Sequence, residues 1–181
     1  PFEHNSVLRP LYRLRDVCKV SLRTMPVERG NLSYDVDELE KQFKRVRPKL
    51  VVVNHGSNVC GVVAPLREIA RLAKEYGALM LVDAAQTLGT IPVNMFEQDI
   101  DYLVFAGHKE LYGPIGVGGL VVNTSIKLEP LIFGGTGVMS ELEGMPDEYP
   151  FRLEAGSQNA AAIAGLAAGI RFVKGNPDIK G

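Results

Sequence analysis

Short apolar runs alternate with amphipathic segments along most of the chain. Residues 51–54, 79–83 and 102–106 are continuous runs rich in aliphatic and β-branched side chains, and they predict strands. Residues 35–43 and 65–76 carry apolar positions at helical spacing, which predicts helices between the strands. Apolar runs without alternation are typical of strands covered on both faces. The pattern therefore predicts a largely parallel sheet.

Local signals mark the ends of the predicted helices. Asp35 is followed three residues later by Glu38, the arrangement of a capping box. Pro65 stands in a first turn, where a missing N–H costs nothing, and Gly77 follows Tyr76 as a helix terminator. Both helices are therefore predicted with defined ends.

The remaining elements are less regular. The pattern predicts a further helix at residues 6–15 and a strand at residues 17–22. It also predicts a strand at residues 118–122, which begins with glycine and can run antiparallel. Asn159 precedes a run of alanine and glycine, which predicts a helix suited to close packing on the sheet or on a partner subunit. The fold class that follows is α/β, a three-layer α/β/α arrangement with a mainly parallel sheet.

Composition narrows the choice of function. The chain has 181 residues, 46% of them hydrophobic and 23% charged, with a net charge of −1, which fits one globular domain. Because basic and acidic residues balance, binding to nucleic acid or to an anionic membrane has little electrostatic basis. No apolar run approaches the roughly 20 residues that span a bilayer, and no signal-peptide pattern is present.

The two cysteines, Cys18 and Cys60, are isolated and lack the spacing of a metal site. This usage is typical of a reducing compartment and predicts a cytoplasmic location. Each cysteine is expected to be a small buried apolar residue, and no metal site is predicted.

Polar residues follow the ends of three predicted strands. Asn54 and His55 follow the first, Asp83 ends the second, and His108 and Lys109 follow the third. Ligands of open α/β sheets bind outside the carboxyl ends of the strands, so these residues are expected to converge on one site.

An amine and a carboxylate at such a site suit pyridoxal 5'-phosphate (PLP). This cofactor withdraws electrons while its ring nitrogen is protonated, and a buried carboxylate such as Asp83 would favour that charged form. Its aldehyde is held as an imine by an unprotonated amine, for which Lys109 is the candidate. For an arbitrary aspartate and lysine the commoner interpretation is structural: Asp83 would merely cap a strand and Lys109 would be a solvated loop residue.

The surrounding residues resemble those of the class V aminotransferases, the family that includes cysteine desulfurases and selenocysteine lyases. The resemblance spans nearly the whole chain. It rests on Glu3-His4-Asn5, Ser57-Asn58-Val59-Cys60-Gly61, Val82-Asp83-Ala84-Ala85-Gln86, Ala106-Gly107-His108-Lys109, Tyr112-Gly113-Pro114, Gly134-Gly135-Thr136-Gly137 and Arg152-Leu153-Glu154-Ala155-Gly156-Ser157-Gln158-Asn159.

The resemblance implies a role for each matching residue. His4 would stack on the cofactor ring and take part in catalysis, and Asn58 would lie beside the phenolic oxygen or the substrate. Asp83 would pair with the ring nitrogen and Gln86 would hydrogen-bond the phenolic oxygen. The rest would act at the phosphate and the aldehyde: His108 on the phosphate, Lys109 as the Schiff-base lysine, and Thr136 on the phosphate of a neighbouring subunit.

The resemblance also implies a large domain of which residues 1–181 are the central part, with an N-terminal phosphate-binding segment and a C-terminal small domain outside it. A homodimer, a small amino-acid substrate and a sulfur-acceptor protein are implied as partners. Ala106 stands where many desulfurases carry serine, and Glu110 resembles a loosely defined desulfurase-like subgroup. These departures leave the substrate open.

Three functions remain compatible with the sequence. The first is a PLP-dependent cysteine desulfurase, which removes sulfur or selenium from a cysteine-like amino acid. The second is an aminotransferase of the same family. The third is a nucleotide-binding or structural α/β module, which is weakened by the absence of a GxGxxG turn after the first strand. Residues 134–137 are either a ligand-free glycine loop or a phosphate nest, and His55 is expected to be structural.

Overall fold

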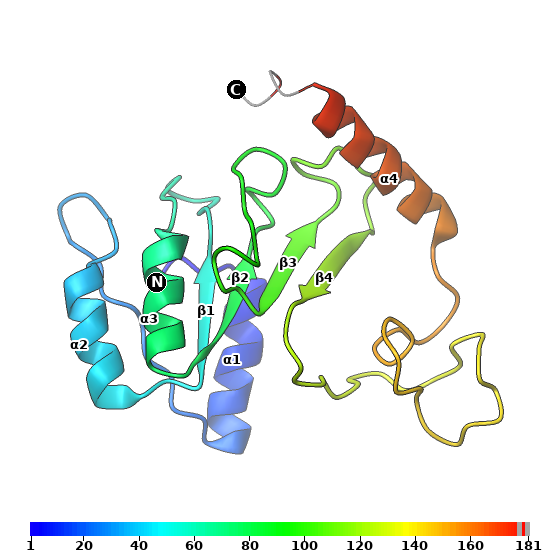
Figure 1. The fold of residues 1–181 in the computed structure, drawn as a ribbon, viewed down its shortest axis with the longest axis horizontal. Helices are drawn as coiled ribbons and strands as arrows, with labels where there is room; N and C mark the ends of the chain where they lie inside the picture. The colour runs from blue at the N-terminus through cyan, green and yellow to red at the C-terminus, as the bar shows by residue number, and fades with distance from the viewer. Residues whose placement is uncertain (177–178, 180–181) are drawn as a thin grey trace.

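The computed structural model describes residues 1–176 and residue 179. Its centre is a four-stranded sheet in the order β1-β2-β3-β4 (Figure 1). The strands are β1 (Leu50–Asn54), β2 (Leu79–Asp83), β3 (Tyr102–Ala106) and β4 (Gly118–Val122). The first three are parallel and β4 is antiparallel to β3, so the mainly parallel sheet is confirmed.

The register of the sheet brings the carboxyl ends of the parallel strands together. Asn54, the last residue of β1, pairs with Asp83, the last residue of β2. Asp83 in turn pairs with Val104, so β3 continues two residues further before it ends at Ala106. Residues that follow these strands therefore leave the sheet along one edge.

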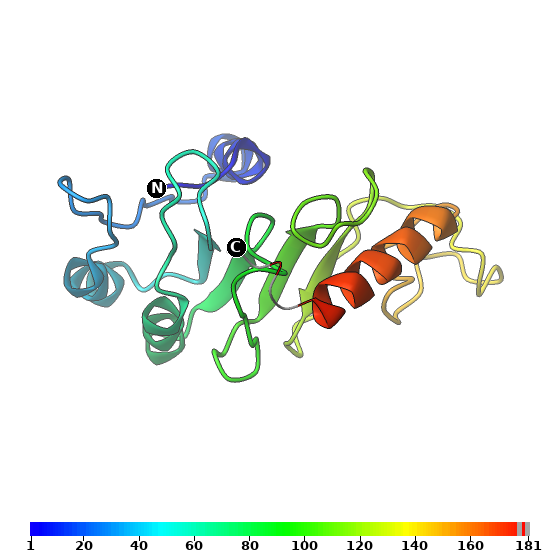
Figure 2. The ribbon, with the colours of Figure 1, turned by 90° about the horizontal axis from the view of Figure 1, so that it is seen from above.

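Helices cover both faces of the sheet, which confirms the three-layer prediction. Figure 2 shows α1 (Asn5–Cys18) on one side, and α2 (Val36–Val46) and α3 (Leu66–Glu75) on the other, while α4 (Ala160–Gly175) lies toward the β4 end of the sheet. In the described part of the chain no helix is both long and apolar enough to cross a bilayer.

The main core lies between the sheet and the helices α2 and α3. Its fully buried side chains come from both layers: Leu39, Ile69 and Leu72 from the helices, and Val53, Met80 and Val82 from the strands. Burying a side chain of this size contributes about 1.5–3 kcal/mol. The core therefore holds β1 and β2, whose ends carry candidate site residues, in a rigid frame.

The structure confirms the residues that were predicted to begin or end the helices. The Oδ1 atom of Asp35 accepts a hydrogen bond from the Glu38 N–H at 2.9 Å, which caps α2. Pro65 directly precedes α3, and Gly77 has a φ of +71°, a conformation that favours glycine. Asn159 caps α4 by accepting from the Ala162 N–H at 3.1 Å.

The predicted strand at residues 17–22 is wrong. Helix α1 continues through Val17 to Cys18, and Lys19 ends it in a left-handed conformation with its N–H bonded to the Leu14 carbonyl. Alternating apolar residues form a strand only beside a second backbone edge, and no described strand pairs with this segment.

The predicted burial of both cysteines is also wrong, because Cys18 and Cys60 are exposed. Cys18 ends α1, a helix without a single buried residue, and Cys60 lies in the loop after β1. A hydrogen bond with Ser57, aided by the backbone at Val62, lowers the pKa of the Cys60 thiol.

Candidate active site

The turn after β1 is held by its own backbone and by β2. The His55 N–H donates to the Asp83 carbonyl at 2.9 Å, and the His55 carbonyl accepts from the Ala64 N–H at 2.9 Å. Within the turn, the Ser57 hydroxyl accepts from the Val59 N–H at 3.2 Å. These bonds leave Asn58 exposed at the tip of the turn.

Asp83 is only 7% exposed, at the carboxyl end of β2. Its Oδ1 atom accepts a hydrogen bond from the Ala85 N–H at 3.0 Å. Among the described residues, no hydrogen bond engages the Oδ2 atom. A buried carboxylate that keeps one oxygen free suits a cationic partner supplied by a ligand.

The turn after β3 carries His108 and Lys109. It is closed by a hydrogen bond from the Gly113 N–H to the Gly107 carbonyl at 2.7 Å and by one from the Tyr112 N–H to the Lys109 carbonyl at 3.0 Å. The Lys109 side chain is half-buried, whereas His108 is exposed.

Helix α4 packs directly against this turn. A Cβ built on Gly169 would lie 2.2 Å from the Leu111 carbonyl oxygen, and one built on Gly165 would lie 3.0 Å from Pro114. Only glycine permits so close an approach. The small residues of α4 thus serve close packing, but these contacts are with the turn after β3 and not with the strands, and packing on a partner subunit stays a prediction. The contact supports the backbone that carries Lys109.

The three turns also contact one another. His55 Nδ1 lies 2.8 Å from the Thr87 hydroxyl, which joins the turn after β1 to the turn after β2. A Cβ on Gly89 would lie 2.6 Å from the Glu110 carbonyl oxygen, so the turn after β2 also contacts the turn of Lys109. The backbones that carry Asn58, Asp83 and Lys109 thus form one contiguous edge, as their strand positions predict.

His4 reaches this edge through its neighbour Glu3. One Glu3 carboxylate oxygen accepts from the Asn54 N–H at 3.0 Å, and the Asn54 side chain donates to the Phe2 carbonyl at 2.9 Å. These contacts fasten the segment before α1 to the end of β1. Burial raises the pKa of Glu3, partly offset by its hydrogen bond from Asn54.

His4 itself is exposed and caps α1. Its Nδ1 atom accepts from the Ser6 N–H at 3.2 Å and lies 2.9 Å from the Ser6 hydroxyl. These two contacts with Ser6 hold the Nδ1 edge of the His4 imidazole, so the faces of the imidazole stay available for stacking. Gln86, half-buried in the turn after β2, belongs to the same edge of the sheet.

Thr136 lies outside the three turns that follow β1, β2 and β3. It lies in the long segment between β4 and α4, which extends beyond the β4 side of the sheet (Figure 1). Its hydroxyl donates to the Val138 carbonyl at 2.8 Å.

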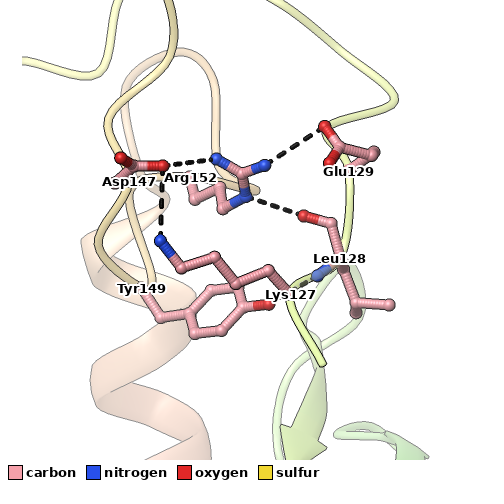
Figure 3. Close-up of polar contacts among 6 residues, drawn as sticks. All are labelled: Lys127, Leu128, Glu129, Asp147, Tyr149 and Arg152. Carbon is pink, nitrogen blue, oxygen red and sulfur yellow. Dashed lines mark hydrogen bonds and ion pairs between the residues drawn. The ribbon is translucent and has the colours of Figure 1, made fainter. Parts of the chain in front are cut away.

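The segment that carries Thr136 is fastened by Arg152, whose side chain is only 11% exposed (Figure 3). The guanidinium donates to the Leu128 carbonyl at 2.7 Å, to Asp147 at 2.9 Å and to Glu129 at 3.1 Å. A planar group with several fixed donors can hold three acceptors at once.

Two further contacts close the same segment. The Tyr149 hydroxyl accepts from the Leu128 N–H at 2.8 Å, and the Gly156 N–H donates to the Gly135 carbonyl at 2.7 Å. The glycine-rich residues 134–137 are therefore held beside the start of α4.

Sequence reasoning assigned no role to Glu3, Thr87 or Arg152. Glu3 and Arg152 lie in motifs shared with the family, but a motif does not show which atoms form contacts. Thr87 contacts His55, a residue 32 positions away in the chain, and no local pattern indicates such a pair. His55 is 4% exposed, as expected of a structural residue, and burial lowers the pKa of its imidazole.

The residues present fit a PLP-like group in their chemistry. Asp83 supplies a buried anion with one free oxygen, and Lys109 supplies an amine from the end of the adjacent strand. Asn58, Gln86 and His108 add neutral polar groups around them. Among the described residues, no group of three His, Cys, Asp or Glu side chains could hold a metal ion.

Comparison with known proteins identifies the family of this chain. A probable cysteine desulfurase of Pyrococcus abyssi is 38% identical over 180 residues, which cover 96% of this chain and 44% of that protein. The apo structure of a cysteine desulfurase from Thermococcus onnurineus superposes with a TM-score of 0.88 at 37% identity, covering 97% of this chain and 44% of its own.

A cysteine desulfurase structure from Escherichia coli gives a TM-score of 0.82 at 29% identity, over 95% of this chain and 43% of its own. The chain thus spans less than half the length of the relatives it matches. The sequence profile of the class-V aminotransferases matches residues 1–179. The chain therefore belongs to the class-V aminotransferase family, and it has the mainly parallel sheet of the desulfurase structures.

Proposed function

We propose that the protein containing this chain is a PLP-dependent cysteine desulfurase, which removes sulfur from cysteine or from a cysteine-like amino acid. The observation that carries the proposal is that the buried carboxylate of Asp83 ends β2, while Lys109 lies in the turn that follows the adjacent parallel strand β3. The names of the similar proteins favour desulfurase over aminotransferase.

In this proposal PLP, when bound, supplies the electron-withdrawing ring that makes bonds at the substrate α-carbon labile. Asp83 would hold a proton on the ring nitrogen through its free oxygen. Asn58, Gln86 and His108 would orient the group through hydrogen bonds, and His4 would cover it from the segment before α1. The Lys109 amine would bind the aldehyde carbon and move protons to and from the substrate.

The proposal extends to partners. A homodimer would allow Thr136, which lies in the segment between β4 and α4, to act on the phosphate bound by the other subunit. Sulfur removed from the substrate would pass to a thiol on an acceptor protein. A cytoplasmic location remains a prediction from cysteine usage.

A labelling experiment tests the proposal. The full-length protein is mixed with PLP, reduced with borohydride, and digested to find the modified lysine by mass spectrometry. We expect the label on Lys109, and we expect sulfide from cysteine in the presence of a reducing thiol. A label confined to other lysines would overturn the assignment. Keto-acid formation without sulfide would favour an aminotransferase.

A further inference from the structure

His55 and Thr87 are buried polar residues to which the proposed function gives no task. Each is 4% exposed, and they lie on different turns, after β1 and after β2. His55 Nδ1 lies 2.8 Å from the Thr87 hydroxyl, a distance typical of a strong hydrogen bond between neutral groups. Buried polar groups of this kind stabilise one arrangement of the segments that carry them.

This hydrogen bond is the second of two attachments between the turns. The first joins the His55 N–H to the Asp83 carbonyl at 2.9 Å. Because both attachments start from the same histidine and end at residues 83 and 87, they bracket Gln86 on the second turn. Together the two attachments fix the orientation of that turn relative to the turn after β1.

Steric contact reinforces the pair. A Cβ on Gly56 would lie 2.5 Å from Cγ2 of Thr87, so the methyl group of Thr87 already fills the space beside the backbone of the first turn. The second turn is also stiff, because the N–H groups of Thr87 and Leu88 both donate to the Ala84 carbonyl, at 3.0 Å and 2.9 Å. A displacement at Thr87 would therefore be transmitted to Gln86 and Asp83.

The imidazole is suited to a neutral role. Burial lowers the pKa of His55 below its ordinary value, which favours the uncharged ring near neutral pH. A neutral imidazole can either donate to the threonine hydroxyl or accept from it, and the hydroxyl can rotate to suit either tautomer.

We propose that His55 and Thr87 are a positioning pair, which sets the spacing between the turn that carries Asn58 and the turn that carries Asp83 and Gln86. The pair acts through these residues and does not itself touch the bound group. The inference rests on the proposed function for the identity of that group, but the coupling between the two turns is a property of the chain itself.

The test replaces the hydroxyl without changing the shape. In the full-length protein, Thr87→Val removes the hydrogen bond and keeps the methyl contact with Gly56, whereas Thr87→Ser keeps the hydroxyl. Thr90→Val is the matched control, because the Thr90 hydroxyl donates to the Thr87 carbonyl in the same turn without contacting His55.

Two readouts are measured on each variant. We expect Thr87→Val to weaken PLP affinity about fivefold to tenfold, the range expected when one buried hydrogen bond is lost. We also expect a shift of the visible absorption of bound PLP, with Thr87→Ser and Thr90→Val close to wild type. Amide hydrogen exchange at residues 84–88 should accelerate in Thr87→Val and not in Thr87→Ser.

The outcomes separate the two proposals. Wild-type protein that binds no PLP would defeat the proposed function, and the exchange at residues 84–88 would still decide whether the pair couples the turns. Unchanged exchange in Thr87→Val would overturn the positioning pair. Faster exchange with unchanged PLP affinity and spectrum would also overturn it, because the hydrogen bond would then be structural only.

Discussion

The amine of Lys109 extends from a turn whose backbone is closed on both sides by hydrogen bonds. Under the proposed function, Lys109→Ala in the full-length protein should abolish turnover, because both the attachment of the cofactor and proton transfer at the substrate would depend on this amine. Sulfide release from cysteine measures the effect. Lys41→Ala is a suitable control, because Lys41 lies exposed on α2. Near-normal turnover in Lys109→Ala would remove the residue from the mechanism.

The imidazole of His55 should make stability depend on pH. Burial lowers its pKa in the folded state, so below its ordinary value of about 6.5 the unfolded chain binds the proton more readily. The contribution of His55 to the free energy of unfolding is therefore fully present above that value, and it is lost as the pH drops through the lowered pKa of the folded state.

Urea unfolding at about pH 8 and about pH 5 measures this dependence. His55→Asn is the comparison, because its amide can replace Nδ1 as a partner for Thr87 but does not titrate. We expect the wild type to lose more stability between the two pH values than the variant. Equal losses in the wild type and in His55→Asn would mean that His55 does not contribute to the pH dependence of stability.

At the scale of elements, the contact between α4 and the Lys109 turn depends on Gly169. A Cβ at this position would lie 2.2 Å from the Leu111 carbonyl oxygen, so Gly169→Ala must displace the helix or the turn. We expect a loss of about 1–3 kcal/mol in the free energy of unfolding, the usual cost of overpacking.

Gly175→Ala in the same helix is the matched control. No atom of the described residues lies within 4 Å of a Cβ at Gly175, so alanine should be neutral or should stabilise the helix by up to about 1 kcal/mol. Chemical denaturation compares the two variants. If Gly169→Ala were as stable as Gly175→Ala, α4 could not pack as closely as described.

At the scale of the whole molecule, the segment between β4 and α4 exposes large apolar side chains. Leu131, Ile132 and Phe133 are 97%, 68% and 74% exposed, in consecutive positions. Contiguous exposed apolar surface of this kind favours association. We expect the isolated chain to self-associate, and we expect Leu131→Ser combined with Phe133→Ser to weaken that association without loss of fold.

Sedimentation over a concentration series measures the association. Phe96→Ser is the control, because Phe96 is 80% exposed but belongs to a different segment, between β2 and β3. A monomeric wild-type chain would contradict the prediction. Equal weakening by Phe96→Ser would point to non-specific apolar contact.

Strands and helices with a clear apolar pattern or a clear capping residue could be predicted from the sequence. The strands that carry the candidate site residues are among them. The continuous apolar runs of β1, β2 and β3 identified a parallel sheet, and Asp35, Gly77 and Asn159 marked helix ends that the structure confirms. The strand predicted at residues 17–22 failed, because strand formation needs a neighbouring edge that a local pattern cannot reveal.

The sequence by itself determined which residues follow the strands, and hence that Asp83 and Lys109 leave the sheet at one edge. The continuous apolar runs of the strands predicted a mainly parallel sheet, whereas the strand order β1-β2-β3-β4 came from the structure. Only the tertiary structure decided which side chains meet across the turns. The contacts of His55 with Thr87, of Glu3 with Asn54 and of Arg152 with Leu128 and Glu129 join residues far apart in the chain. Such contacts depend on distances between atoms after folding, which no periodicity encodes.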